Sequence, residues 1–503
     1  MVITSNQLET GGLGAPVSVD VFTELEALAF LAERTGRSND TGARELAAEV
    51  GFLPLALAQA AAVIAAQHLG YPTYLARLRT VPVRDYLKRA AGEPYPHGAA
   101  EAIVLALDAA ADADPAGLCR GLIDVAALLS AAGVSRQLLY AAGQQGLLTH
   151  PGTDTAAGPE QVDEALARLA SASLLTFSVD DSTVAAHRLT MRVTRERMAQ
   201  EKTLAGLGAG VAELLSAVAG SLAETWQNGP AARDAIQQIM VLHEHLAPHL
   251  GSQDTALTET LLQLRGWAIW CLGTLGDSFT QAIRYGQDLV ADSGQILGQT
   301  HPDTLTTRSN LAYAYQDAGR LEEAIPLFER TLADREQILG ETHPDTLTAR
   351  SNLAAAYHDA GRLAEAIPLF ERALADREQI LGEAHPDTLA CRNNLAMAYR
   401  AAGRLAEAIP LLERSLADFE QILGHTHPHT LASRNNLASA YQDAGRLAEA
   451  IPLFERTFTG FEQTLGETHP STLTSRNNLA HAYQAAGRRK EAEGFRNRGE
   501  PRS

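Results

Sequence analysis

Lysine is scarce in this sequence of 503 residues. Lys88, Lys202 and Lys490 are the only lysines, and none of them follows a glycine. The phosphate-binding loop GxxxxGK[ST] is therefore absent, since its lysine must follow a glycine-rich turn to reach the β- and γ-phosphates. ATP hydrolysis by a P-loop within this sequence is excluded.

Cysteines and long apolar runs are also few. Cys119, Cys271 and Cys391 lie far apart without CxxC spacing, which favours a reducing compartment over a disulfide framework or a zinc site. The first residues, MVITSNQLET, carry neither the basic nor the apolar part of a signal peptide. The longest uncharged stretch, 50–67, is broken by Pro54 and is too short to span a bilayer. We therefore expect a cytoplasmic protein with no membrane segment.

Basic residues are outnumbered by acidic ones. The sequence has 60 aspartates and glutamates against 41 lysines and arginines, a formal net charge of −19. Such a charge repels a phosphate backbone, so we expect no nucleic-acid partner. The composition, with 46% hydrophobic and 20% charged residues, is that of a folded protein. The motifs GxSxG and HExxH are missing, so we also expect no enzyme.

Repetition dominates the C-terminal half. His-Pro-x followed by Thr-Leu recurs every 42 residues, at His301, His343, His385, His427 and His469. In the first unit, residues 305–315 and 321–339 have apolar residues at helical spacing, with Gly319 and Gly340 where the helices should end. Pro326 is expected near the first turn of the second helix, where a missing N–H costs least. The pattern predicts helix pairs stacked into an α-solenoid.

The small and large residues of each unit match the tetratricopeptide signature. In the words RNNLA, AGR..EAI, LADREQILG and HPDTL, the array closely resembles the repeats of kinesin light chains and looks equally like the repeat arrays of bacterial regulators. The resemblance covers residues 257–498, and residues 259–300 form a degenerate first repeat. It implies a tetratricopeptide-repeat superhelix of about five to six repeats that binds a peptide or protein.

Two polar residues recur in the first helix of every unit. Asparagine occupies one position, at Asn310, Asn352, Asn394, Asn436 and Asn478. Arginine stands two residues earlier, at Arg308, Arg350, Arg392, Arg434 and Arg476. In stacked repeats of this type the first helix lines the concave surface, where asparagine amides would clamp a peptide backbone and arginines would bind carboxylates. The alternative is that these residues bridge neighbouring repeats and contact no partner.

The histidines do not form a metal-binding pattern. Each histidine of the His-Pro motif lies in a separate loop between repeats, so the five cannot converge on one ion. Of two closer groups, HTHPH at 425–429 lacks a further ligand at suitable spacing, and HEHLAPH at 243–249 lies on an amphipathic helix and does not form HExxH. We therefore expect structural roles for the histidines and no metal site.

The N-terminal part of the chain does not repeat. A buried strand is expected at VIT (2–4), and helices are expected at Thr23–Thr35, Gly42–Val50 and Gln59–His68. The segments VITSNQ and ARELAAEVGFLPLALAQAAAVIA resemble the second half of the NB-ARC nucleotide-binding module of STAND-type signal-transducing ATPases.

That resemblance implies specific roles for two positions. Pro54 stands at the proline that contacts adenine in the family, whereas Asn6 replaces the sensor arginine. The P-loop half of the module, which precedes this part in the family, is missing from the sequence. We therefore expect a truncated or late-started form of the module that binds ATP or ADP weakly or not at all.

Residues 99–200 continue in the order of that family. Helices at about 116–131, 135–142 and 161–172, followed by two short strands, predict a winged helix. Its third helix carries more acidic than basic residues, with Arg168 as its only cation, so we expect it to dock within the molecule and not on DNA. His187, in VAAHRLT, resembles the MHD-type histidine that contacts the β-phosphate of ADP; the alternative is a hydrogen-bonding role between wing and helix.

The expected protein is mostly α-helical. The resemblances divide it into a remnant sensor strand (1–20), a helical subdomain (21–98), a winged helix (99–200), a helical linker (201–256), a tetratricopeptide solenoid (257–498) and a tail (499–503). They imply a non-catalytic regulator or scaffold, without a cofactor, that binds a peptide or protein and relays this to the NB-ARC-like part. The alternative is a fragment of an ADP/ATP-dependent switch that still binds ADP through Pro54 and His187.

Overall fold

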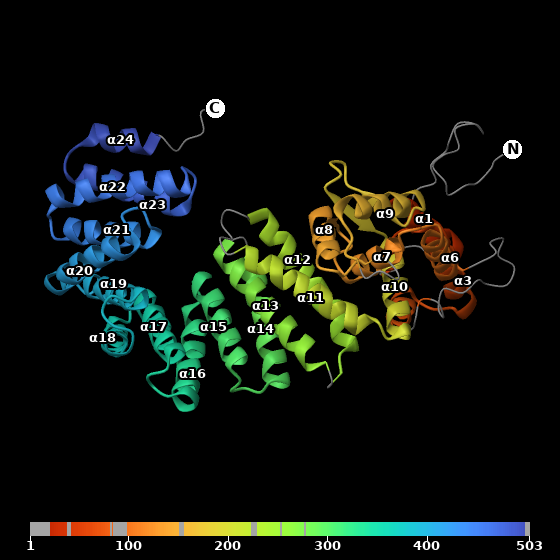
Figure 1. Cartoon of the computed structure of the whole chain (residues 1–503), viewed down its shortest axis with the longest axis horizontal. Helices are drawn as coiled ribbons and strands as arrows, with labels where there is room; N and C mark the ends of the chain where they lie inside the picture. Colours follow the sequence, from red (N-terminus) through yellow and green to blue (C-terminus); the bar gives the residue numbers. More distant parts are fainter. Residues whose placement is uncertain are drawn as a thin grey trace. The chain divides into compact units, whose positions relative to one another are not determined.

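The chain folds into two compact units, Met1–Leu275 and Gly276–Ser503, and both are almost entirely helical (Figure 1). The computed structural model describes residues 21–37, 42–80, 83, 98–149, 155–222, 229–251, 254–275 and 278–497. The expected strand at 2–4 and Asn6 lie outside these residues. The unit boundary after Leu275 falls later than the expected start of the solenoid at residue 257.

The first unit opens with a small helical bundle. Its helices are α1 (Glu24–Thr35), α2 (Ala43–Glu49), α3 (Pro54–Gln67) and α4 (Tyr71–Thr80). The predicted first and second helices are present, and Thr23 caps α1 by accepting a hydrogen bond from the Glu26 N–H. The third helix begins at Pro54, earlier than expected, because proline is well suited to a first helical position where no N–H is needed.

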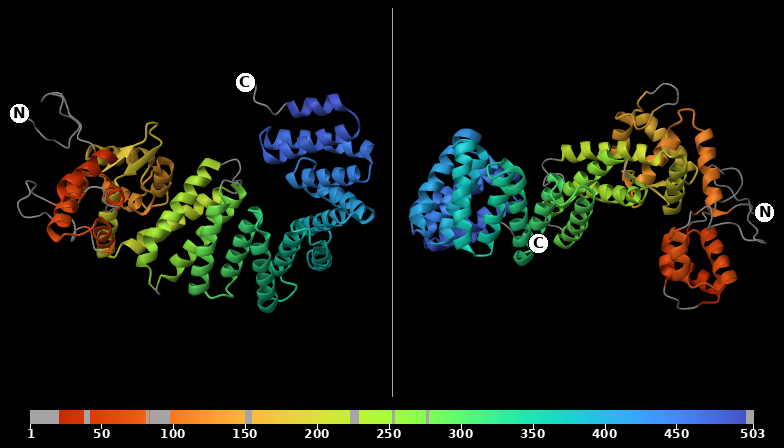
Figure 2. Two further views of the ribbon diagram at one scale, coloured as in Figure 1. Left: turned by 180° about the vertical axis from the view of Figure 1, so that it is seen from behind. Right: turned by 90° about the horizontal axis from the view of Figure 1, so that it is seen from below.

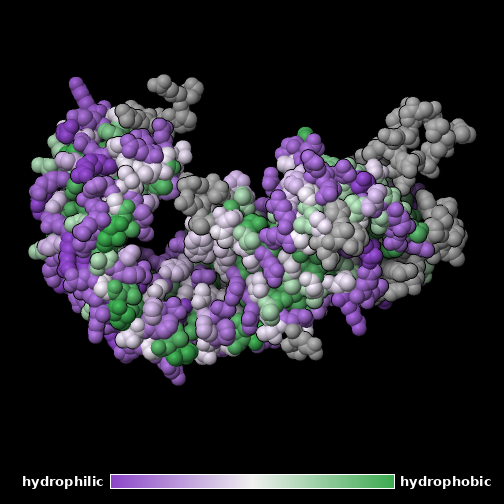
Figure 3. Space-filling view, in the orientation of Figure 1, coloured by the Kyte–Doolittle hydropathy of each residue, from purple (hydrophilic) through white to green (hydrophobic). Residues whose placement is uncertain are grey.

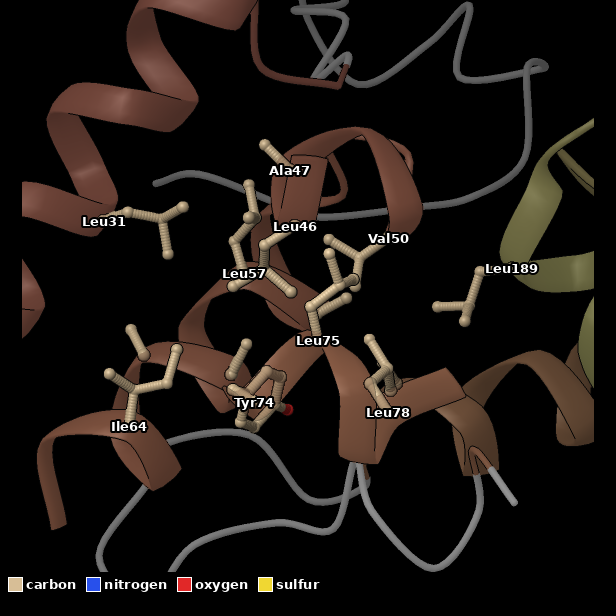
Figure 4. Packing of buried hydrophobic residues seen from close by; sticks show 14 of the residues in the cluster. Leu31, Leu46, Ala47, Val50, Leu57, Ile64, Tyr74, Leu75, Leu78 and Leu189 are labelled. Atoms are coloured by element: carbon tan, nitrogen blue, oxygen red, sulfur yellow. The ribbon is translucent and has the colours of Figure 1, made fainter. Parts of the chain in front are cut away.

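The core of this bundle draws on a distant segment. Leu31, Leu46 and Leu57 are fully buried and point toward one another (Figure 4). Leu189, which comes from α10 (Arg188–Glu201), packs into the same cluster. Apolar burial therefore fastens the bundle to the part of the chain that follows residue 98.

Residues 98–201 combine helices with a small sheet. The helices before α10 are α6 (Ala99–Asp112), α7 (Leu118–Leu128), α8 (Arg136–Gln144) and α9 (Pro159–Ser171). The strands β1 (Val134–Ser135), β2 (Leu175–Phe177) and β3 (Thr183–Ala186) pair antiparallel in the order β1-β3-β2, with Val134 opposite Val184. The hairpin β2–β3 is as predicted. Strand β1 was not predicted, because a strand of two residues is too short to show an alternation of apolar and polar side chains.

The last helices of the first unit are α11 (Leu204–Ser221), α12 (Gly229–Leu246), the 3-10 turn η1 (Ala247–His249) and α13 (Thr255–Leu275). Among the described helices, α11 is the one long and apolar enough to cross a membrane, with a mean hydropathy of 1.4. Its Val211, Leu214 and Leu215 are fully buried, and α11 packs against α12 and α13. One face of α11 is therefore packed inside the first unit.

The C-terminus of α7 is closed by two basic side chains from other helices. Arg195 of α10 donates from Nη1 to the carbonyl of Ala127 at 2.6 Å. The ring Nδ1 of His245, on α12, lies 3.0 Å from the carbonyl of Leu128. These bonds satisfy carbonyls that have no partner within the helix. Burial, helped by the charge of Arg195, lowers the pKa of His245 to about 4.

In the second unit α14 (Phe279–Ile296) packs against the first of five helix pairs (Figures 1 and 2). The first helices of the pairs are α15 (Pro302–Asp317), α17 (Pro344–Asp359), α19 (Pro386–Ala401), α21 (Pro428–Asp443) and α23 (Pro470–Ala485). The second helices are α16 (Leu321–Leu339), α18 (Leu363–Ile380), α20 (Leu405–Leu423), α22 (Leu447–Leu465) and α24 (Arg489–Asn497). The predicted α-solenoid is confirmed.

Each His-Pro motif starts a helix. The histidine is the N-cap, and in α15 the Nδ1 of His301 accepts the N–H of Asp303 at 3.2 Å. The same bond recurs in the other four first helices. The proline occupies N1, and Gly319, with a φ of 72°, gives the left-handed turn between the paired helices. The histidines thus have the structural role that was expected.

The prolines of the second helices lie deeper than predicted. Pro326 is the sixth residue of α16 and lies inside the helix, and the corresponding prolines are also internal in α18, α20 and α22. The helix begins at Leu321, as predicted, so Pro326 lies in its second turn, beyond the positions where a missing N–H costs least. Pro326 is exposed, so water can reach the carbonyl that loses its N–H partner.

The array curves with its first helices inside. In Figure 1 the first helices follow the inner side of the curve and the second helices the outer side. Successive first helices also pack on one another, α17 on α19, α19 on α21 and α21 on α23. Closer approach on that side makes the exposed face of the first helices the concave surface. We call this surface the inner face.

Acid should destabilise the first unit through His245. The folded-state pKa of about 4 lies below the value of 6.5 of an ordinary histidine, so the unfolded chain takes up the proton more readily. Stability should therefore fall as pH decreases from about 6.5 to about 4, by roughly 3 kcal/mol from this group. Melting curves of the full chain and of His245→Asn, whose amide keeps the bond to Leu128 but does not titrate, measure the difference. A pH dependence equally steep in both proteins contradicts this role.

Candidate partner-binding face

The arginine row lies between repeats, not on the inner face. Arg308, Arg350, Arg392 and Arg434 are at most 2% exposed. In Arg392, Nη1 donates to Asp418 of α20 at 2.8 Å, and Nη2 donates to Glu378 of α18 at 2.9 Å. One guanidinium of α19 thus joins the second helices of two successive repeats.

The same joint recurs along the array with small changes. Arg350 pairs with Asp376 and Glu336, Arg308 with Asp334, and Arg434 with Glu420. Backbone carbonyls complete the set, among them that of Gln299 for Arg308. The prediction that these four arginines bind a partner is wrong, because their guanidinium groups are buried and already hydrogen-bonded within the array.

The joint is weaker toward the C-terminus. The position of the aspartate is taken by Gly460 in the fourth repeat, so Arg434 keeps one carboxylate partner, Glu420, together with the carbonyl of His425. A Cβ on Gly460 would lie 2.5 Å from a methyl carbon of Leu431, which explains the glycine. Arg476, in the last repeat, is half-buried, and its buried Nε has no hydrogen-bond partner. A partner role for Arg476 stays a prediction.

The asparagine row, in contrast, reaches solvent. Asn394 is exposed and the other four are half-buried, each at the same position of a first helix. Asn352 hydrogen-bonds with the phenol of Tyr313 in the preceding repeat. In the last two repeats, Asn478 Nδ2 donates to Asn435 Oδ1 at 3.2 Å. These amides therefore lie on the inner face, and some already contact neighbouring repeats.

A second set of hydrogen bonds between repeats, from tyrosine to glutamate, was not predicted from the sequence. Tyr357 donates from its hydroxyl to Glu329 of the preceding repeat at 2.5 Å, and the guanidinium carbon of Arg362 lies 4.3 Å from the centre of the tyrosine ring. The bond recurs at Tyr399, Tyr441 and Tyr483. Its signal was present, since a tyrosine follows a glutamate by 28 residues in each of these units.

In the first unit, the structure places His187 against Gly51, in the loop that precedes Pro54. Pro54 begins α3, and the loop before it passes the ring of His187, whose Nε2 lies 2.8 Å from the carbonyl oxygen of Gly51. The Nδ1 of His187 accepts the N–H of Leu189 at 3.2 Å, so Nε2 carries the proton and donates to Gly51. Burial lowers the pKa of His187. Both ring nitrogens are used within the protein, which matches the alternative of a hydrogen-bonding role.

Helix α9, which corresponds to the predicted third helix at 161–172, also forms contacts within the first unit. Its Arg168 pairs through Nη1 with Asp114 at 3.2 Å, and its Asp163 accepts from the hydroxyl of Tyr140 at 2.7 Å. Helix α9 packs on α7. Within the described residues, no group of three or more His, Cys, Asp or Glu could hold a metal ion.

The comparisons with known proteins identify the second unit by sequence. The tetratricopeptide repeat family model matches in five overlapping stretches, 265–337, 303–379, 345–421, 388–463 and 429–499. The C-terminal half of the chain is therefore an array of tetratricopeptide repeats. No curated protein sequence matches the chain.

Solved structures give similar proteins for different parts of the chain. Kinesin light chain TPR-like repeats from Podosopora anserina are 39% identical, with 39% of this chain and 92% of that chain covered and a TM-score of 0.35. A STAND protein with a tetratricopeptide repeat sensor from Pyrococcus horikoshii is 11% identical, with 94% and 71% covered and a TM-score of 0.36. NprR in complex with its cognate peptide NprX is 15% identical, with 56% and 77% covered and a TM-score of 0.38.

Removing one buried guanidinium should loosen the array. Arg392→Met leaves Asp418 and Glu378 without their partner, and we expect a loss of about 2–3 kcal/mol because both carboxylates stay partly hydrated. Arg414→Met is the matched control, since Arg414 pairs with Glu383 at the exposed surface, where a pair contributes at most about 1 kcal/mol. Urea unfolding followed by circular dichroism compares them. An equal loss of unfolding free energy in both variants would refute the role of the buried arginines in joining the repeats.

The contact between His187 and Gly51 can be tested by replacing Gly51 with alanine. Gly51 has a φ of 62°, and a Cβ there would lie 2.1 Å from Nε2 of His187. Gly36, with a φ of 69° and open space around a Cβ, is the control for backbone strain alone. Gly51→Ala should destabilise the first unit by about 1–2 kcal/mol more than Gly36→Ala. In a His187→Ala background the excess should vanish; an excess that persists in the melting temperatures contradicts the contact.

Proposed function

We propose that this chain is a non-catalytic protein-binding regulator or scaffold. Its inner face binds an extended segment of a partner protein, and the first unit relays the binding event. The observation that carries the proposal is the row of five solvent-reaching asparagines at one position of a stiff helical array. An amide offers a donor and an acceptor together, as a peptide backbone does, so a periodic row of amides suits an extended chain.

The buried arginines support this assignment indirectly. They hold neighbouring repeats in a fixed relation, so the asparagines keep their spacing without a bound partner. A preformed surface loses less entropy on binding than a mobile one. Because these four arginines are already hydrogen-bonded within the array, recognition of a backbone rests on the asparagines and on the residues that surround them.

The relay part of the proposal rests on the first unit. The proposal of a winged helix is supported by the helix, strand, helix, helix, strand, strand order from α7 to β3. The bond between His187 and Gly51 ties this region to the bundle that contains Pro54. We propose a NB-ARC-like module that acts here as a scaffold without nucleotide. A cytoplasmic location follows from the same proposal, as does the absence of nucleic-acid and membrane partners.

The double substitution Asn394→Ala/Asn436→Ala tests the inner face. Peptides selected from a random 12-residue display library on the full chain serve as probes, and their affinity is measured by fluorescence anisotropy. Each lost hydrogen bond should cost about 0.5–1.5 kcal/mol, so binding should weaken by about 1–3 kcal/mol, a factor of about 5 to 150. Folding should be nearly unchanged, because alanine is favourable in a helix.

Gln379→Ala/Gln421→Ala is the matched control, since both amides are exposed on second helices of neighbouring repeats. It should leave the affinity unchanged. A large fall in melting temperature of the asparagine variant with unchanged affinity would assign the row to repeat packing and overturn the proposal.

A further inference from the structure

The inner face has an uneven distribution of charge. Besides asparagine, each first helix presents five other positions there; in α15 they are Asp303, Thr306, Tyr313, Gln316 and Asp317, each at least partly exposed. The first two repeats carry four carboxylates at these positions and no arginine or lysine: Asp303, Asp317, Asp345 and Asp359.

The last three repeats lose most of this charge. Asp387 and Asp443 are their only carboxylates at the same positions, and Asp443 is paired with Arg400 at 2.5 Å. The position of Asp303 and Asp345 is taken by His429 and then by Ser471 in the fourth and fifth repeats. The exposed positions of the inner face are thus acidic at its N-terminal end, where the buried Arg335 of α16 donates to the Asp345 carbonyl and the Thr306 hydroxyl from behind, and close to neutral at its C-terminal end.

The acidic end also contains an unusual aromatic residue. Tyr313 is 37% exposed, although its ring packs edge-on against Phe328 with 5.2 Å between ring centres. The corresponding residues in the later repeats are smaller or polar: Ala355, Met397, Ser439 and His481. An exposed aromatic face beside carboxylates is a favourable place for a guanidinium or an ammonium group.

Two of these carboxylates oppose one another across the boundary between the first and second repeats. Asp359 accepts from Gln316 Nε2 at 2.6 Å and contacts His358 at 3.2 Å. Burial is the main cause that raises the pKa of Asp317, and the charge of Asp359 adds to it, whereas His358 and Gln316 lower the pKa of Asp359. A cation between the two carboxylates would reduce the repulsion that Asp317 experiences.

We propose that the inner face binds an extended basic peptide whose lysine- or arginine-rich part lies on the first two repeats, at Asp317, Asp359 and Tyr313. This inference rests on the proposed function. The asparagine row holds the backbone along the whole face, while the charge difference between its ends fixes the position and direction of the peptide. Charge complementarity with a basic segment is the reason for choosing this partner over an acidic or an apolar one.

The experiment uses the full chain and the same random 12-residue display library. Selected peptides should contain a cluster of lysines or arginines. Asp317→Asn/Asp359→Asn should weaken their binding about 5- to 20-fold at low salt, and 0.5 M NaCl should weaken binding to the unmodified chain similarly. Glu322→Gln/Glu467→Gln, which removes two exposed charges away from the inner face, should change affinity less than twofold.

The position of the peptide gives a second measurement. A photo-crosslinking residue beside the basic cluster should label residues 302–359, as found by mass spectrometry, and not residues 428–485. Selected peptides that are acidic or apolar, or crosslinks confined to the last two repeats, overturn this inference while the asparagine variant still loses affinity. Binding that survives the asparagine substitutions overturns the proposed function itself.

Discussion

The second unit depends on the buried guanidinium groups of its first helices, and those of Arg350 and Arg392 each join the second helices of two successive repeats. Arg392 holds Asp418 of its own repeat and Glu378 of the one before, so a single side chain sets the distance between successive repeats. A buried charge is costly unless it is fully paired. Repeats can therefore slide past one another only by leaving that charge uncompensated, and the register of the array is fixed as a result.

The fixed register makes a binding surface possible. The tyrosine–glutamate bonds, such as that between Tyr357 and Glu329, fasten one side of each joint, while the His-Pro caps start each first helix at the same residue. Together they repeat the exposed side of the first helices every 42 residues. Variation at the exposed positions then changes what the surface recognises without changing its geometry, which is how an acidic end and a neutral end can coexist.

In the first unit, buried and half-buried side chains also join segments that are distant in sequence, but these contacts do not repeat. The ring of His187 ties the loop before Pro54 to the start of α10, and Leu189 continues this contact into the hydrophobic core of the bundle. Arg195 and His245 close the end of α7 from two different helices. Each of these joints pairs a polar side chain with a backbone carbonyl, so the segments they connect move together.

The sequence by itself determined the local features of this protein. Helix pairs and their glycine turns follow from residues only a few positions apart, and the 42-residue period repeats them along the chain. Tertiary structure decided which polar residues face solvent. Arg308 and Asn310 are two residues apart on one helix, and both suit a polar surface, yet the arginine is buried against Asp334, 26 residues away, while the asparagine stays half-exposed. Strand β1 and the partner of His187 were beyond reach for the same reason, because each forms only when distant segments meet.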